Sequence, residues 1–162
     1  RNPYRERGDE VDVARPKIVV IGIGRFGSAL VEALREQGCP STAVDMDPDA
    51  VHLHQQKGHE VHYGDATDPE FLAGIPMKGT EWIVSTLRDV VTTRQLLFHL
   101  RDIGYGGQIA VAAAGEAEGE GLTRAGADLV LVPYEDAARQ TAARLAGAVS
   151  AAAPSRTTGD AA

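Results

Sequence analysis

The chain has 162 residues, of which 43% are hydrophobic and 24% are charged, and its formal net charge at pH 7 is −7. This length suits one domain with a sizeable core, and the acidic balance argues against a nucleic-acid partner because binding to a phosphate backbone needs a basic face. The single cysteine, Cys39, excludes an internal disulfide framework and fits a reducing compartment. No window approaches the ~18 apolar residues that a membrane-spanning helix needs.

The N-terminal segment differs in composition from the rest. Residues 1–16 are rich in charge, carry two prolines and show no apolar period, which is typical of a linker or arm. The chain begins with Arg1 and not with Met, and we expect it to be part of a longer protein. From Lys17 onward, short apolar segments alternate with helical patterns.

The most informative segment joins an apolar strand, residues 17–21, to a helix predicted over residues 25–37. Gly22 permits a tight turn off the strand, Gly24 lets the backbone approach phosphate oxygens, and Gly27 lets the helix lie against the sheet. The helix N-terminus then points unpaired N–H groups at the phosphates. The turn is the hexapeptide Gly22-Ile23-Gly24-Arg25-Phe26-Gly27.

A second short strand, residues 41–44, ends in an acid, Asp45. At about twenty residues beyond the glycine turn, a carboxylate can accept both ribose hydroxyls of an adenine nucleotide, and it would repel a 2′-phosphate. Strand, turn, helix and acid together predict an adenine-nucleotide site. The alternative is a turn whose glycines serve only packing, and it leaves the acid unexplained.

Further elements follow in regular alternation. Asp47-Pro48 and Asp68-Pro69 each predict a helix start, with Asp as the N-cap and Pro at the first helical position, and Gly104 predicts a helix end. Six strands alternating with helices imply a Rossmann-like α/β fold with a doubly wound parallel sheet, whose ligand lies at the carboxyl ends of the strands. The remaining predicted strands are residues 61–63, 81–85, 108–112 and 128–132. Besides the two helices that start after Asp47 and Asp68, three more helices are predicted, over residues 90–103, 116–125 and 134–153.

Four segments resemble the RCK domain, the regulator of potassium conductance, also called the TrkA N-terminal domain. The resemblance covers roughly residues 17–145 and favours the domains of Kef-type cation/proton antiporters and prokaryotic potassium channels. Residues 17–150 are therefore assigned to a nucleotide-binding domain with a C-terminal crossover helix, and residues 151–162 to a mobile tail. The four segments are Gly22-Ile-Gly-Arg-Phe-Gly27, Val44-Asp-Met-Asp-Pro48, Tyr63-Gly-Asp-Ala-Thr67 and Ala125-Gly-Ala-Asp128, the last leading to Val132-Pro133.

The resemblance implies a regulatory domain that is not an enzyme. Such domains bind AMP, ADP, ATP or NAD(H), with AMP the favoured ligand here, and couple the ligand state to a membrane pore. We therefore expect a homodimer or higher homo-oligomer at the cytoplasmic face of the cell membrane, attached to a membrane-embedded transport domain of the same or a partner chain. The small residues of the last predicted helix, such as Ala138 and Ala142, suit close helix approach in a dimer.

The resemblance also implies roles for individual residues. Backbone N–H groups of Ile23 to Phe26 hold phosphate, and Arg25 either adds its guanidinium there or is a solvated surface arginine. Asp65 and Ala66 bind the adenine edge, unless Asp65 only forms a local turn beside Gly64, and Thr86 lines the nucleotide from the opposite side. No catalytic or metal-binding residue is predicted. The predicted binding residues are Gly22, Ile23, Gly24, Arg25, Phe26, Gly27, Asp45, Met46, Asp65, Ala66, Thr67 and Thr86.

Two other functions fit parts of the sequence. An NAD-dependent oxidoreductase fragment shares the fold and the acid, but the tyrosines lack a lysine four residues later and no room remains for a substrate domain. A methyltransferase would explain the acids after the second and third strands, but its ligand does not require the third glycine.

The segment Ala112-Ala113-Ala114-Gly115 stands where glutathione-responsive Kef proteins carry arginines, which argues against a glutathione response.

Overall fold

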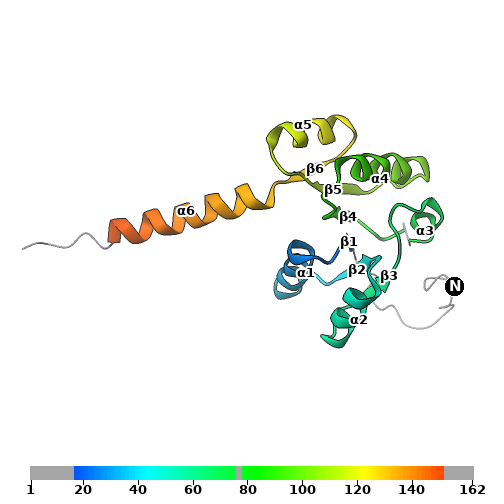
Figure 1. Ribbon diagram of the computed structural model, residues 1–162, viewed down its shortest axis with the longest axis horizontal. Helices are drawn as coiled ribbons and strands as arrows, with labels where there is room; N and C mark the ends of the chain where they lie inside the picture. Colours follow the sequence, from blue (N-terminus) through cyan, green and yellow to red (C-terminus); the bar gives the residue numbers. More distant parts are fainter. Residues whose placement is uncertain (1–16, 76–77, 152–162) are drawn as a thin grey trace, which may run out of the picture. The chain divides into compact units, whose positions relative to one another are not determined.

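Figure 1 shows a computed structural model of the protein, which describes residues 17–75 and 78–151. The described residues form six strands and six helices in strict alternation, as predicted. The strands are β1 (Ile18–Ile21), β2 (Ser41–Asp45), β3 (Val61–Tyr63), β4 (Trp82–Ser85), β5 (Gln108–Ala112) and β6 (Leu129–Leu131). The helices are α1 (Arg25–Glu36), α2 (Pro48–Gln56), α3 (Pro69–Ala73), α4 (Val90–Asp102), α5 (Glu116–Arg124) and α6 (Pro133–Ala151).

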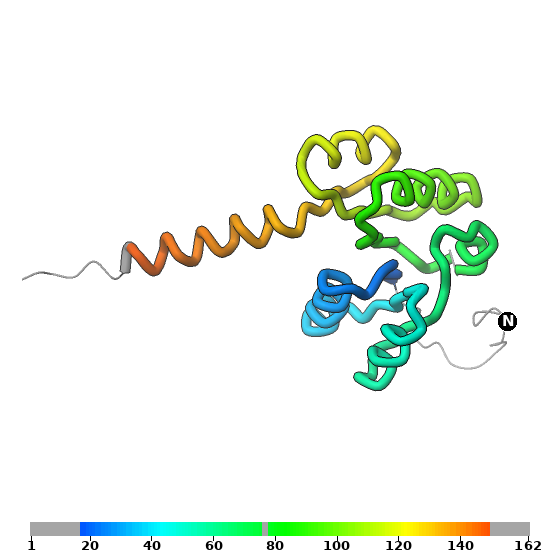
Figure 2. The backbone as a smooth tube through the Cα atoms, viewed as in Figure 1, coloured from blue at the N-terminus to red at the C-terminus, as the bar shows by residue number. Residues whose placement is uncertain are grey.

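The strands form one parallel sheet in the order β3-β2-β1-β4-β5-β6. β1 lies at the centre, with Ile18 paired to Ser41 on one side and to Trp82 on the other. After β3 the chain runs through α3 to the other half of the sheet, a path that the tube in Figure 2 makes visible. The strand order therefore reverses between β1 and β4, and this confirms the predicted doubly wound Rossmann-like fold.

Helices cover both faces of the sheet, as Figure 1 shows. Successive side chains of a strand point to opposite faces, so Val20 of β1 packs on the side of α1 and α2, whereas Val19 and Ile21 pack on the side of α3, α4 and α5. All three side chains are buried. Burial of a side chain of this size contributes roughly 1.5–3 kcal/mol, which explains why the apolar strands form the centre of the domain.

The predicted helix starts agree with the observed caps. The Asp47 carboxylate accepts a hydrogen bond from the N–H of Asp49, and the Asp68 carboxylate accepts one from the N–H of Glu70. Gly104 follows the end of α4 with φ +87°, a conformation that favours glycine. The last helix begins at Pro133, one residue earlier than predicted, because proline suits the first position of a helix.

The described residues divide into two units. One contains all the strands and α1 to α5 and ends at Val132, and the other contains α6. The arm predicted for residues 1–16 lies outside the described residues, as does the tail predicted for residues 151–162 apart from Ala151. Over residues 17–75 and 78–151, no helix is both long enough and apolar enough to cross a membrane.

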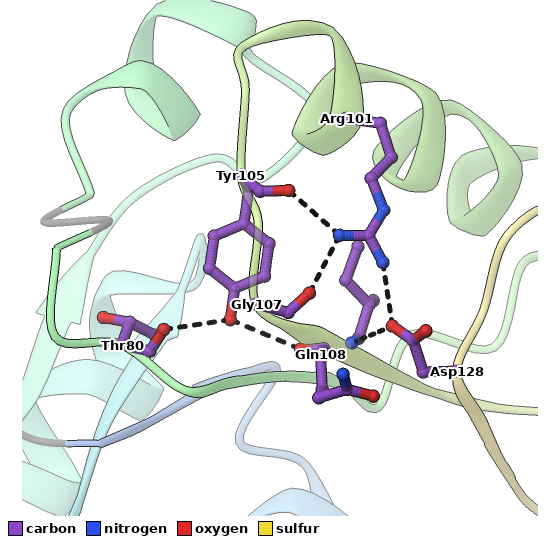
Figure 3. A network of polar contacts seen from close by, with 7 residues as sticks. Thr80, Arg101, Tyr105, Gly107, Gln108 and Asp128 are labelled. Carbon is purple, nitrogen blue, oxygen red and sulfur yellow. Dashed lines mark hydrogen bonds and ion pairs between the residues drawn. The ribbon is translucent and has the colours of Figure 1, made fainter.

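A polar network joins the end of α4 to the starts of β5 and β6 (Figure 3). One carboxylate oxygen of Asp128 accepts hydrogen bonds from Arg101 Nη2 and from the N–H of Ile109, each at 2.8 Å. Arg101 Nη1 also donates to the carbonyl oxygens of Tyr105 and Gly107 at 2.9 and 2.8 Å. The network therefore fixes the amino-terminal edge of the sheet, the edge opposite the strand ends where a Rossmann ligand binds.

Candidate functional site

A pocket of about 270 Å³ lies at the carboxyl ends of β1, β2, β3 and β4, at the point where the strand order reverses. Several predicted binding residues line it, namely Gly22, Asp45, Met46, Asp65, Ala66 and Thr67. The other lining residues are Ile21, Val44, Gly64, Leu87, Arg88, Asp89 and Thr92. The remaining predicted residues are not part of its lining: Ile23, Gly24, Arg25, Phe26, Gly27 and Thr86.

The glycine turn is held closely against the start of α1 and the end of β4. Gly22 has φ +91°, and a Cβ atom there would come within 2.5 Å of Thr86 Oγ1. A Cβ atom on Gly27 would collide with the carbonyl oxygen of Gly22 and approach its carbonyl carbon to 2.8 Å. A Cβ atom on Gly24, in contrast, would meet nothing within 4 Å. Gly22 and Gly27 are therefore required by packing, while Gly24 borders open space.

The N-terminus of α1 has no side-chain cap. Its N-cap residue is Gly24, and its first turn contains no acidic residue, whereas α2, α3 and α4 are each capped by an aspartate. The first N–H groups of a helix have no partner within it. The N–H groups of Gly24, Arg25 and Phe26 are therefore not bound by a capping side chain, and they lie at the positive end of the helix dipole, where an anion is favoured.

Asp45 is bound to the backbone on both sides. Its Oδ2 accepts a hydrogen bond from the N–H of Ile23, and its Oδ1 accepts one from the N–H of Asp47, both at 2.8 Å. The N–H of Ile23, which was predicted to hold phosphate, is thus occupied by Asp45. Each carboxylate oxygen can accept a further hydrogen bond, so Asp45 orients the turn and still presents acceptors to the pocket.

Two more acids of the pocket are held in the same way. Asp65 Oδ1 accepts from the hydroxyl of Thr67 at 2.6 Å and from its N–H at 2.9 Å. Asp89 Oδ2 accepts from the hydroxyl of Thr92 at 2.6 Å and from its N–H at 2.8 Å. These bonds lower the pKa of Asp65 and the pKa of Asp89, chiefly through the threonine hydroxyls. Both side chains are therefore ionised acceptors near neutral pH.

The local turn at Asp65, proposed as an alternative to adenine binding, is thus present. It uses only one of the two carboxylate oxygens, so the turn and a ligand contact are compatible. The corresponding group at Asp89 was not predicted. The spacing of Asp89 and Thr92, an N-cap acid three residues before a hydroxyl at a strand-to-helix junction, is the signal that could have indicated it.

Thr86 contacts the protein backbone. Its hydroxyl donates, in a shared hydrogen bond, to the carbonyl oxygens of Ile21 at 3.0 Å and Gly22 at 2.9 Å. Its own N–H donates to the Ile21 carbonyl at 2.9 Å. Thr86 therefore stabilises the glycine turn, and the next two residues, Leu87 and Arg88, line the pocket. The other predicted side-chain contact, Arg25, is exposed and lies outside the lining.

The histidines of the first half of the chain form local contacts. His59 Nε2 lies 3.4 Å from Glu32 Oε2, and its ring lies 5.8 Å from that of His54. Burial, Lys57 and His59 lower the pKa of His54. In the part of the chain that the structure describes, no three His, Cys, Asp or Glu side chains are grouped so that they could hold a metal ion.

The fold and the pocket together define a Rossmann-like nucleotide-binding domain. The family model of the TrkA-N domain matches residues 18–133, and the chain belongs to this family.

Three solved structures extend the comparison. The NAD(P)-binding domain of an exopolyphosphatase-related protein from Archaeoglobus fulgidus has 23% identity and a TM-score of 0.74, over 82% of this chain and 99% of that chain. The GsuK channel bound to NAD has 26% identity and a TM-score of 0.64, over 80% of this chain and 24% of the channel chain, and GsuK is also known bound to ADP. The AMP-bound Kef C-terminal domain of Shewanella denitrificans has 19% identity and a TM-score of 0.66, over 82% and 80%. The similarity to the first and the third of these structures shows a shared fold.

Proposed function

We propose that this domain binds an adenine nucleotide, AMP, ADP, ATP or NAD(H), and thereby regulates ion transport by a potassium channel or a cation/proton antiporter. The observation that carries the proposal is the uncapped N-terminus of α1 beside a pocket walled by Asp45 and Asp65. Membership of the TrkA-N family and the likeness to GsuK, known with NAD and with ADP, support it.

Each part of the nucleotide has a counterpart in the site. The N–H groups of Gly24, Arg25 and Phe26 hold phosphate at the helix N-terminus. Asp45 accepts the ribose hydroxyls with the acceptor capacity that its two backbone bonds leave. Asp65 accepts from the exocyclic amine of adenine with Oδ2, since its Oδ1 is bound to Thr67. Ala66 donates its N–H to a ring nitrogen.

The domain acts by differential affinity and catalyses no reaction. A nucleotide that binds one arrangement of the regulator more tightly than another shifts the equilibrium by the difference in binding free energy, and a coupling of about 1–3 kcal/mol is enough to bias a gate. The transport domain that responds lies in the membrane, with this domain at its cytoplasmic face.

Calorimetric titration with AMP, ADP, ATP, NAD⁺ and NADH tests the function. We expect at least one to bind, and Asp45→Ala to weaken that binding at least about tenfold, because hydrogen bonds to charged groups contribute about 1.5–3 kcal/mol each. Asp49→Ala removes an exposed carboxylate that lies outside the pocket lining and serves as the matched control. Failure of all five nucleotides at millimolar concentration would reject the proposal, and turnover of NADH with a simple carbonyl would favour the oxidoreductase instead.

Assembly is a separate part of the proposal. We expect at least a dimer, with α6 (Pro133–Ala151) contributing small residues such as Ala138 and Ala142 to the interface. Sedimentation equilibrium at about 100 μM should give a mass of at least two chains, since helices with small side chains can approach each other closely. A purely monomeric result would contradict this part and leave nucleotide binding untouched.

A further inference from the structure

The pocket lining contains one positively charged side chain among several carboxylates. Asp45, Asp65 and Asp89 carry negative charges on its wall, and Arg88 is the lone positively charged residue of the lining. A nucleotide brings further negative charge with its phosphates. A site with this excess of carboxylates disfavours phosphate unless a cation and backbone N–H groups offset the repulsion.

None of the three acids neutralises Arg88. The carboxylates of Asp65 and Asp89 are bound to threonines of their own turns, and that of Asp45 is bound to two backbone N–H groups. Across the described residues, Arg88 has no hydrogen bond or ion pair, and its side chain is exposed. Its guanidinium thus remains available to a ligand.

The loop that carries Arg88 lies close to the glycine turn. It lies two residues beyond Thr86, whose hydroxyl binds the carbonyl oxygen of Gly22 at 2.9 Å. A side chain of the intervening Leu87 reaches within 3.7 Å of where a Gly22 Cβ would stand. The loop after β4 is therefore attached to the glycine turn, the segment that brings phosphate to the N-terminus of α1.

We propose that Arg88, and not the side chain of Arg25, recognises the phosphate of the bound nucleotide, so that the site prefers a nucleotide to its nucleoside. This inference rests on the proposed function. Guanidinium groups bind phosphate through two parallel hydrogen bonds. Arg25, at the first position of α1, contributes its backbone N–H, while its exposed side chain lies outside the pocket lining.

The test compares adenosine with AMP, ADP and NAD⁺ in calorimetric titrations of the wild type, Arg88→Gln, Arg25→Gln and Arg94→Gln. Arg94 is an exposed arginine of α4 outside the pocket lining, so Arg94→Gln controls for the loss of one positive charge. We expect Arg88→Gln to lower the affinity for the phosphorylated ligands about tenfold or more and to change the affinity for adenosine less than about twofold. We expect Arg25→Gln to weaken them less than Arg88→Gln does. Circular-dichroism melting should give equal midpoints for Arg88→Gln and the wild type, since Arg88 has no partner to lose.

The outcomes separate the two proposals. If the wild type binds none of the phosphorylated ligands, the proposed function fails and this inference fails with it. If the wild type binds one of them and Arg88→Gln binds it equally well, only the role of Arg88 is overturned. Equal weakening of adenosine and AMP in Arg88→Gln would also overturn it, because the guanidinium would then contact the base or the ribose. If Arg25→Gln loses more affinity for the phosphorylated ligands than Arg88→Gln does, the side chain of Arg25 recognises the phosphate and the proposal is overturned.

Discussion

Replacing Gly27 with alanine is expected to lower the midpoint of thermal unfolding by roughly 10 °C and to abolish nucleotide binding. In an ordinary helix interior this change gains about 1 kcal/mol, because alanine is the better helix former. Here the new Cβ would collide with the carbonyl oxygen of Gly22 and lie 3.2 Å from Thr86 Oγ1. Backbone cannot yield as a flexible side chain does, so the overpacking costs about 2–3 kcal/mol net. The shift of α1 away from the glycine turn then removes the phosphate site.

Gly24→Ala provides the contrast. A Cβ atom at this position meets nothing within 4 Å, so the protein should remain stable to within about 1 kcal/mol of the wild type. The methyl group projects into open space beside the N-terminus of α1, and nucleotide affinity should still fall. Thermal melting and calorimetry of both variants check the pair. A Gly27→Ala protein that melts within about 2 °C of the wild type would show that the turn can move at little cost.

Replacing Asp128 with alanine is expected to destabilise the domain by about 2 kcal/mol without involving the pocket. The N–H of Ile109 donates to the Asp128 carboxylate at 2.8 Å, and Ile109 is fully buried. A buried N–H left without an acceptor costs about 1–3 kcal/mol. The ion pair with Arg101 adds little, because the two side chains are 39% and 32% exposed and water screens the charges.

Asp128→Asn separates the two contributions. Asparagine keeps an oxygen that can accept from the Ile109 N–H and removes the charge that pairs with Arg101, so we expect less than half the loss seen in Asp128→Ala. Urea denaturation of both variants gives the comparison directly, since the free energy of unfolding varies linearly with denaturant. If the two variants lose equal stability, the ion pair with Arg101 carries the effect and the buried N–H does not.

These two predictions concern opposite edges of one sheet. Gly27 lies at the carboxyl-terminal edge, where loops from four strands converge on the pocket. Asp128 lies at the amino-terminal edge, where the network of Arg101 and Tyr105 ties α4 to β5 and β6 (Figure 3). Changes at the first edge should alter both binding and stability, and changes at the second should alter stability alone.

Much of the fold followed from the sequence because its signals are local. Alternating apolar and helical segments predicted the order of elements, and Asp47 and Asp68 marked helix starts through bonds to N–H groups only two residues away. Gly22 and Asp45 were predicted to bind the ligand because each has its place in a strand-turn-helix unit. They do line the pocket, while their contacts with a nucleotide stay a prediction.

Only the tertiary structure could decide which distant groups share a partner. Parallel strands adjacent in a sheet are far apart in sequence. Pairing of β1 with β2 brings Asp45 to the N–H of Ile23, 22 residues earlier, and pairing of β1 with β4 brings Thr86 to the carbonyl of Gly22, 64 residues earlier. The same pairing places Arg88 and Asp89 on the pocket wall and leaves Arg25 outside it. The sequence determined that a glycine turn and an acid would meet at the end of a parallel sheet. The strand order determined which charged side chains stand around them.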